Sequence, residues 1–144
     1  MRVLFLFGPS LGALGTREPE RYGTQTLQEI MHEVTERADA LGHETEWRQS
    51  DHEGELVGWL LGSRGDGFDV VVVNPGALTH YSYAIRDAIE ASGVPAIEVH
   101  MTNIYAREEF RRESVISPVC RATITGAGAG GYHLALEALP WITR

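Results

Sequence analysis

Arg17 and Tyr22 form the pair of residues in this sequence with the clearest chemical potential. Both lie in a glycine-punctuated loop, residues 7–23, that follows a short hydrophobic run and has the character of a lid. A free tyrosine has a pKa of about 10, so about one in a thousand is ionised at neutral pH. A fixed cation such as arginine stabilises the phenolate, which would allow Tyr22 to act as a base. The competing interpretation is a solvated, charged surface loop.

Glu98 and His100 are a second candidate pair. They stand two residues apart in EVHMTN, at the end of an expected strand, so both side chains should point to the same face. A carboxylate at this spacing can fix the tautomer of an imidazole and stabilise its cation. The competing interpretation is an interior histidine with satisfied hydrogen bonds. The place of His100 at the end of a strand, next to a candidate base, favours acid/base chemistry.

Two further motifs supply groups that could hold a substrate. Arg107 and Arg111, in AREEFR, are four residues apart and would share one face of a helical turn. Asn74 and His80, in NPGALTHYS, precede an expected helix whose N-terminus would attract a carboxylate. A small anionic or hydroxylated substrate needs such donors, although a solvated face explains the two arginines equally well.

The hydrophobic pattern predicts the elements that position these residues. Apolar runs predict five strands, at residues 3–7, 43–48, 69–73, 95–99 and 123–124. Helical spacing predicts helices over residues 26–41, 55–61, 82–91 and 132–139, with a short turn over 107–111. Strands and helices that alternate in this way form a parallel sheet covered on both faces. We therefore expect an α/β fold, a flavodoxin-like three-layer sandwich with a five-stranded parallel sheet.

In a sheet of this kind, ligands bind beyond the carboxyl ends of the strands. The residues that follow the first four strands are Gly8, Pro9, Ser10, Gln49, Ser50, His52, residues 74–80 and residues 100–103. Histidines, amides and hydroxyls should therefore meet the loop that carries Arg17 and Tyr22 at one edge of the sheet. This is the polar inventory of an acid/base site.

The composition argues against several classes of function. A chain of 144 residues, 43% of them hydrophobic, fits a single domain over residues 1–144. A net charge of -8 makes nucleic acid and anionic membranes poor partners, because either requires a concentrated basic surface. All 12 basic residues are arginine, which removes catalysis through a lysine Schiff base.

The patterns of metal, disulfide and dinucleotide sites are weak or missing. Cys120 is the only cysteine and is expected in the core. GAGAGG, residues 126–131, formally matches GxGxxG, but no later strand with a ribose-binding acid follows, so tight helix packing is the better interpretation. We expect no metal and no cofactor. The N-terminal apolar run of about six residues is too short for a signal peptide or a membrane span, which indicates a cytoplasmic protein.

The motifs together resemble those of the type II 3-dehydroquinate dehydratases over essentially the full length. The matching segments are LGTREPERYG, RQSDHEGEL, NPGALTHYS, AIRDA, EVHMTN, AREEFR and GGYHLAL. The resemblance implies a flavodoxin-like fold, a dodecamer of four trimers, and catalysis without a metal or a cofactor. It implies a lyase of the shikimate pathway to aromatic amino acids, which dehydrates 3-dehydroquinate to 3-dehydroshikimate by anti elimination through an enolate.

The resemblance also implies a role for each matching residue. Tyr22 would be the base, with Arg17 as the lid arginine and Arg107 as a second cation. His100 would be the general acid, oriented by Glu98. The groups that hold the hydroxyls and carboxylate of the substrate would be Asn74, His80, Arg111, the backbone of Met101 and Thr102, and Asp87 from a neighbouring subunit.

One short segment departs from the family pattern. Where the family usually reads NGPN, this chain has FGPS at residues 7–10, and the second asparagine of that pattern helps to position the water that stabilises the enolate. Ser10 has no amide donor, and the loss of one such donor costs about 10² to 10³ in rate.

Three hypotheses stay open: a 3-dehydroquinate dehydratase, a paralogue that acts on another cyclic hydroxyketone, for example in secondary metabolism, and a non-catalytic oligomeric binding protein. The intact Arg17, Tyr22 and His100 argue against the third.

Overall fold

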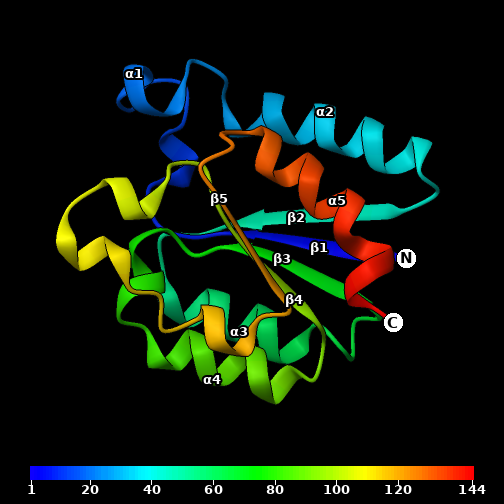
Figure 1. The fold of residues 1–144 in the computed structure, drawn as a ribbon. Helices are drawn as coiled ribbons and strands as arrows, with labels where there is room; N and C mark the ends of the chain where they lie inside the picture. The colour runs from blue at the N-terminus through cyan, green and yellow to red at the C-terminus, as the bar shows by residue number, and fades with distance from the viewer.

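The computed structural model describes residues 1–144 as a five-stranded parallel sheet between two layers of helices (Figure 1). The strands, in the order β2-β1-β3-β4-β5 across the sheet, are β1 (Arg2–Phe7), β2 (Glu44–Gln49), β3 (Val70–Asn74), β4 (Ala96–His100) and β5 (Ala122–Thr125). Helices α2 (Leu27–Ala40) and α5 (Gly130–Ile142) cover one face, and α3 (Glu53–Gly62) and α4 (Tyr83–Ser92) cover the other. The predicted fold is confirmed, with element ends that differ from the predicted ones by at most three residues.

Strand β1 lies between β2 and β3, and its sequence explains this position. Val3, Phe5 and Phe7 belong to the core beneath α2 and α5, whereas Leu4 and Leu6 belong to the core on the side of α3 and α4. All five side chains are buried. A strand that is apolar on both sides needs helices on both faces, which is why it reads as a continuous hydrophobic run.

The helices are positioned by local signals at their ends. Thr26 and Glu29 form a capping box at the start of α2, in which Thr26 Oγ1 accepts a hydrogen bond from the Glu29 N–H at 3.1 Å. At the start of α5, a Cβ on Gly131 would lie 3.0 Å from Val99 Cγ1, so this glycine allows α5 to pack closely on the sheet. None of the helices has the length and apolar character that a membrane span requires. Cys120 is only half-buried, at the margin of the core rather than inside it.

The carboxyl ends of the strands gather at the left of Figure 1, away from the two termini. At this edge lie helix α1 (Pro19–Tyr22) and four 3₁₀ turns, η1 (Leu11–Ala13), η2 (Gly76–His80), η3 (Ile104–Ala106) and η4 (Glu109–Arg112). The loops after β1 and β3 touch here, because a Cβ on Gly8 would lie 2.4 Å from the carbonyl oxygen of Pro75. Glycine at position 8 thus permits a close backbone contact between the loops after β1 and β3.

Candidate active site

A cavity of about 110 Å³ opens at the carboxyl edge of the sheet. Its walls come from the loop after β1 with α1, from the end of β3 with η2, and from the end of β4 with η3 and η4. Of the 12 predicted site residues, 10 line the cavity: Ser10, Arg17, Tyr22, Asn74, His80, His100, Met101, Thr102, Arg107 and Arg111. The parallel arrangement of the strands therefore brings the separate motifs to one place, as the strand-end argument requires.

Tyr22 faces two arginines. The Arg107 Nη1 donates a hydrogen bond to Tyr22 Oη at 3.1 Å, and the Arg17 guanidinium lies 5.0 Å from the centre of the Tyr22 ring. The sequence singles out Arg17 as the partner of this tyrosine, but the cation that contacts the phenol oxygen in the structure is Arg107. Both positive charges lie where they would stabilise a phenolate.

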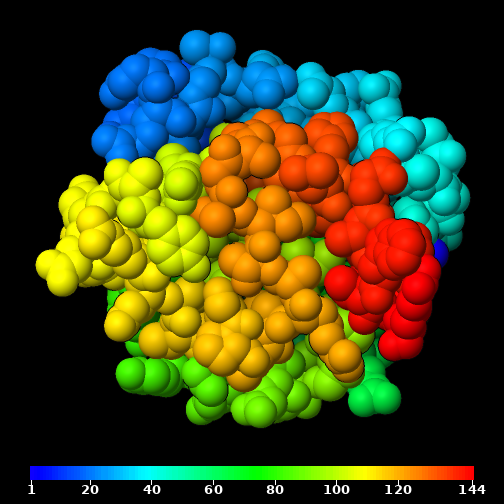
Figure 2. Space-filling model, in the orientation of Figure 1, coloured from blue at the N-terminus to red at the C-terminus, as the bar shows by residue number.

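The segment that carries Tyr22 is the short helix α1. Pro19 starts it, which suits a proline because the first helical residues have no intrahelical acceptor for their N–H groups. Gly23 ends it at a positive φ of 81°. Figure 2 shows this blue segment packed beside the yellow segment that contains Arg107, so the two parts of the chain close over one end of the sheet.

Arg107 and Arg111 reach the cavity from separate pieces of backbone. The predicted helical turn over 107–111 is only partly correct, because Arg107 is extended and the 3₁₀ turn spans Glu109–Arg112. Arg111 Nε donates to Glu108 Oε2 at 2.6 Å. The Nε atom of Arg107 is buried without a hydrogen-bond partner in the protein. A buried donor without a partner is costly, so this atom suits a site whose ligand supplies the acceptor.

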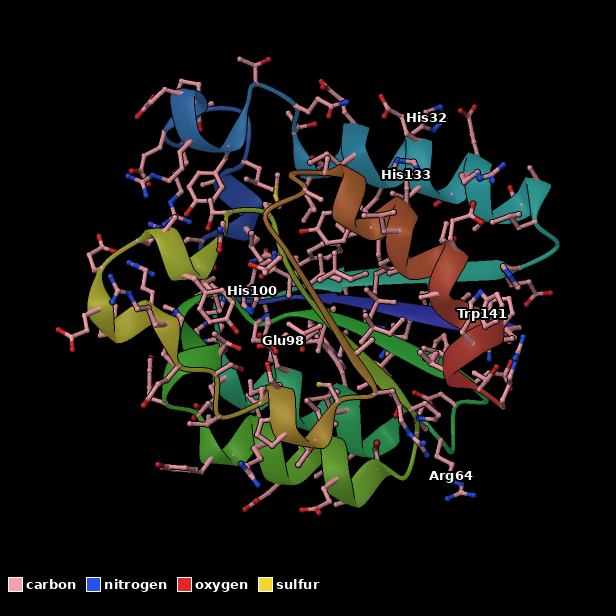
Figure 3. All side chains as sticks on the ribbon, in the orientation of Figure 1. His32, Arg64, Glu98, His100, His133 and Trp141 are labelled. Atoms are coloured by element: carbon pink, nitrogen blue, oxygen red, sulfur yellow. The ribbon has the colours of Figure 1, made fainter.

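Glu98 and His100 form a buried pair at the end of β4. The His100 Nε2 and Glu98 Oε1 atoms are 2.9 Å apart, with 6% of His100 and 0% of Glu98 exposed to solvent. Figure 3 shows the two labelled side chains side by side. His100 lines the cavity, and Glu98 lies behind it and does not reach the cavity.

The surroundings of Glu98 keep it ionised. Burial alone would raise the pKa of this carboxyl, but the hydrogen bond and charge of His100 and the hydroxyls of Ser114 and Ser117 lower it to about 2. A carboxylate can only accept hydrogen bonds, so the His100 Nε2–H is the donor in the pair. The Nδ1 atom of His100 is then left to exchange a proton with a ligand.

Asn74 and His80 are held in fixed orientations. The Asn74 Nδ2 donates to Tyr132 Oη at 2.9 Å, and its Oδ1 accepts from the Gly76 N–H at 3.1 Å. The His80 Nδ1 donates to the Glu113 carbonyl oxygen at 2.7 Å. Burial lowers the pKa of His80, which keeps this side chain a neutral hydrogen-bonding group near neutral pH.

The two departures from the family pattern lie in different environments. Phe7 is 1% exposed and stacks edge-on against Trp47 and Tyr132, with ring centres 6.3 Å and 5.3 Å away, and it does not line the cavity. Ser10 does line the cavity, in the left-handed region at φ 71°, and its N–H donates to Asp51 Oδ1 at 2.9 Å. Of these two residues, Ser10 is therefore the one that changes the chemical lining of the site.

The remaining predicted positions lie outside the cavity of this chain. Asp87 is exposed on α4, and no contact joins it to the site. Gln49, the last residue of β2, donates to the Gly8 carbonyl oxygen at 3.2 Å and so supports the loop, but neither it nor His52 lines the cavity. No group of three or more His, Cys, Asp or Glu side chains is arranged to hold a metal ion.

Sequence reasoning missed the residues that support the site from behind. They are Tyr132, which orients Asn74, and the four hydroxyl residues around Glu98, namely Thr79, Ser114, Ser117 and Thr123. Thr79 falls inside the NPGALTHYS motif, but no local pattern shows that it faces Glu98. The only available signal was indirect, since a buried carboxylate needs donors from somewhere.

The chain is similar to several known proteins over nearly its full length. The chain is 52% identical to a 3-dehydroquinate dehydratase of Desulfitobacterium hafniense over 144 residues, which covers 99% of this chain and 98% of that protein. The crystal structure of the type II dehydroquinase from Propionibacterium acnes superimposes with a TM-score of 0.93 at 45% identity, over 99% of this chain and 97% of that one. A 3-dehydroquinate dehydratase-like protein from Bifidobacterium longum gives a TM-score of 0.72 at 36% identity, over 100% and 98% of the two chains. The model of the class II dehydroquinase family matches residues 1–140, and the chain therefore belongs to this family.

Proposed function

We propose that this protein is a hydro-lyase that dehydrates 3-dehydroquinate to 3-dehydroshikimate in the shikimate pathway. The observation that carries the proposal is that a tyrosine paired with arginine and a histidine paired with a buried carboxylate face the same cavity. These are the base and the acid that a stepwise elimination needs. The choice of 3-dehydroquinate as the substrate rests on the relatives that are named 3-dehydroquinate dehydratase.

The first step is proton abstraction by Tyr22. As a phenolate, its oxygen takes a proton from the carbon next to the ketone, and the electron pair of the broken C–H bond moves onto the ketone oxygen as an enolate. Arg107 and Arg17 stabilise the phenolate before the transfer. Because the basic residues are all arginine, the reaction cannot run through a lysine imine.

The second step is loss of the hydroxyl group. The enolate collapses to a ketone, its electron pair forms the new C=C bond, and the C–O bond breaks. His100 gives the departing oxygen a proton, so that water leaves, while Glu98 stabilises the charge on the imidazolium. Proton transfer from Tyr22 back to His100, through solvent, restores both groups.

Several polar groups hold the substrate during these steps. Arg111 and the N–H groups after β4 suit a carboxylate, and Asn74 and His80 suit hydroxyls, since both are neutral donors or acceptors fixed by hydrogen bonds. Ser10 occupies the place from which the family asparagine positions a water on the enolate. A serine hydroxyl with a second water can serve the same oxygen, at lower efficiency.

The same proposal includes an oligomer, a dodecamer of four trimers, in which Asp87 enters the site of a neighbour. Asp87 and Tyr83 are four residues apart on the exposed face of α4, and Tyr83 is 68% exposed. A large aromatic and a carboxylate on one exposed face suit a contact between copies of the chain. Light scattering on the purified protein tests this, and a monomer would contradict it. The cytoplasmic location expected from the sequence belongs to the same proposal.

The deciding experiment is a direct assay of enone formation from 3-dehydroquinate with the purified protein. Turnover at about 1 to 10³ per second, the ordinary range for enzymes, supports the proposal and shows that Ser10 is a tolerated variant. Absence of turnover, with binding of 3-dehydroquinate retained, would favour the paralogue that acts on another cyclic hydroxyketone. Absence of both would favour a binding protein.

A further inference from the structure

The Glu98 carboxylate is enclosed by four side-chain hydroxyls, which we call the hydroxyl cage: Thr79, Ser114, Ser117 and Thr123. Thr79 and Ser114 donate to Oε1, the latter at 2.6 Å, and Ser117 and Thr123 donate to Oε2, the latter at 3.4 Å. With the bond from His100, both oxygens have their acceptor positions filled. None of the four hydroxyl residues lines the cavity.

The cage joins three parts of the chain that are far apart in sequence. Thr79 belongs to η2, Thr123 to β5, and Ser114 and Ser117 to the segment that follows the cavity arginines. The Ser114 Oγ atom also accepts from the N–H groups of Ile116, at 3.2 Å, and Ser117, at 3.0 Å. The Val115 N–H donates to the Thr79 carbonyl oxygen at 2.9 Å, so backbone contacts hold the same hydroxyls in register.

We propose that the hydroxyl cage, and Thr79 and Ser117 above all, positions the general acid by holding the Glu98 carboxylate ionised and fixed behind His100. The inference rests on the proposed function and deepens it, because it names residues that touch neither substrate nor cavity. They act through Glu98 and are positioning residues. A hydroxyl that donates to a carboxylate stabilises the charged form more than the protonated form, so each lost donor favours a protonated, rotated Glu98.

Glu98 has few charged neighbours, so the stabilisation of its buried carboxylate depends largely on the hydroxyls. His100 is the only ionisable side chain in contact with it. His80 and Cys120 lie close enough to feel its charge, and the negative charge of Glu98 helps to raise the pKa of Cys120, after burial, to about 12. No arginine pairs with Glu98. Besides the imidazole, the hydroxyls are therefore what offsets the cost of burying a carboxylate here.

Thr79 offers a matched test, because it is fully buried and valine has nearly its shape. We compare Thr79→Val, which removes the hydroxyl, with Thr79→Ser, which keeps it. Removal of the hydroxyl should lower kcat on 3-dehydroquinate about 10-fold with KM changed less than about twofold, and Thr79→Ser should regain most of the rate. Thr45→Val, which removes a hydroxyl bonded only to Thr35 at 3.2 Å, is the control and should leave kcat unchanged.

The pH dependence separates this role from simple packing. Loss of two donors, in Thr79→Val with Ser117→Ala, should raise the pKa of Glu98 above its value of about 2, so activity should fall at acid pH where the wild type keeps it. The midpoint of acid unfolding should move to higher pH in the same variant, a readout that needs no turnover. Thr79→Ser should behave as the wild type in both measurements.

Two results would overturn the inference. One is a set of superimposable pH profiles for wild type, Thr79→Val and Ser117→Ala. The other is an equal loss in Thr79→Val and Thr79→Ser, which would show that the site responds to side-chain packing and not to the hydroxyl. If Thr79→Val fails to fold, Ser117→Ala alone decides, since Ser117 is nearer the surface. A wild-type protein without turnover defeats the proposed function, while acid unfolding of the same variants still tests the cage.

Discussion

The two sides of the cavity are built in different ways. On the acid side, Glu98 and His100 extend a central strand, are almost completely buried, and are fixed by hydrogen bonds to η2, η5 (Ser117–Val119) and β5. On the base side, Tyr22 lies on α1, a helix of four residues with none of them buried. The only ion pair of Arg17, on the same loop, is with Glu18 at 3.8 Å, and a third of the Arg17 side chain is exposed.

This difference suits the roles that we propose for the two groups. A general acid that depends on a buried carboxylate needs a permanent, dry environment, which only the sheet can supply. A base that must meet the substrate carbon needs a segment that can open and close, and a four-residue helix with no fully buried residue suits that task. The Arg107–Tyr22 hydrogen bond joins the two sides of the cavity, since Arg107 follows β4. We call the side built on the sheet, with Glu98 and His100, the fixed side.

Removal of the Tyr22 oxygen should have the largest effect. Tyr22→Phe keeps the ring beside Arg17 but deletes the base, so kcat should fall about 10²- to 10⁴-fold with substrate affinity largely kept. Stability should change little, because phenylalanine keeps the ring that packs against the core. Tyr105→Phe, at an exposed tyrosine outside the cavity, is the matched control. Steady-state kinetics check this, and activity within a few-fold of the wild type would remove Tyr22 from the mechanism.

On the fixed side, Glu98→Gln should damage activity and stability together. His100 loses its orienting charge, and kcat should fall about 10²-fold. With the pKa of Glu98 at about 2 in the folded protein against 4.5 ordinarily, its ionised form stabilises the fold by about 3 kcal/mol above pH 4.5, and this is lost as pH falls toward 2. Urea unfolding between pH 7 and 3 measures the contribution. Equal pH dependence in the wild type and Glu98→Gln would contradict it.

These two regions also differ in how far the sequence predicts them. The strand ends are predictable, because hydrophobic runs locate β1, β3 and β4 and parallel topology then places Asn74, His100 and the lid at one edge. The pairing of Glu98 with His100 follows from the two-residue period of a strand.

Contacts between distant segments were not predictable. Nothing local shows that Tyr22 Oη meets Arg107 rather than Arg17, or that Thr79 and Ser114 face the same carboxylate. The helical turn expected over 107–111 is interrupted, because Arg107 must extend to reach the cavity. Such details depend on how loops pack against each other. The spacing of hydrophobic residues along the sequence predicts helices and strands, but it does not predict which loops touch.

The link between the two halves is tested by comparing Arg107→Met with Arg17→Met. Arg107 donates directly to the phenol oxygen, so its loss should lower kcat more, by about 10²-fold, and Arg17→Met by about 10-fold. Both variants should reach their maximum rate at higher pH than the wild type, because the phenolate has lost a stabilising cation. pH–rate profiles measure this. A larger loss in Arg17→Met would place the activating charge on the lid, and unchanged profiles would sink the activation model.

Phe7→Asn tests whether the fixed side tolerates the amide of the family pattern here. Phe7 is buried against Trp47 and Tyr132, so an asparagine would leave a cavity and an amide in apolar surroundings. We expect a loss of about 3 kcal/mol in the free energy of unfolding. Urea denaturation measures it, with Phe7→Leu as the apolar control, which should cost less. Equal stability of Phe7→Asn and the wild type would show that a buried partner accepts the amide.

Ser10→Asn should have the smallest effect and is the sharpest test of how complete the lining of the cavity is. Ser10 already adopts the left-handed conformation that asparagine tolerates better than most residues, and its N–H stays bonded to Asp51, so the substitution should fold without strain. An added amide donor at the cavity should raise kcat on 3-dehydroquinate about 10-fold, within the range known for one oxyanion donor. Ser10→Ala, which removes the hydroxyl as well, should lower it. If both Ser10→Asn and Ser10→Ala leave the rate unchanged, a water held elsewhere stabilises the enolate, and serine is a neutral replacement for the family asparagine. If Ser10→Asn lowers the rate, the cavity is shaped around the smaller side chain for a different hydroxyketone.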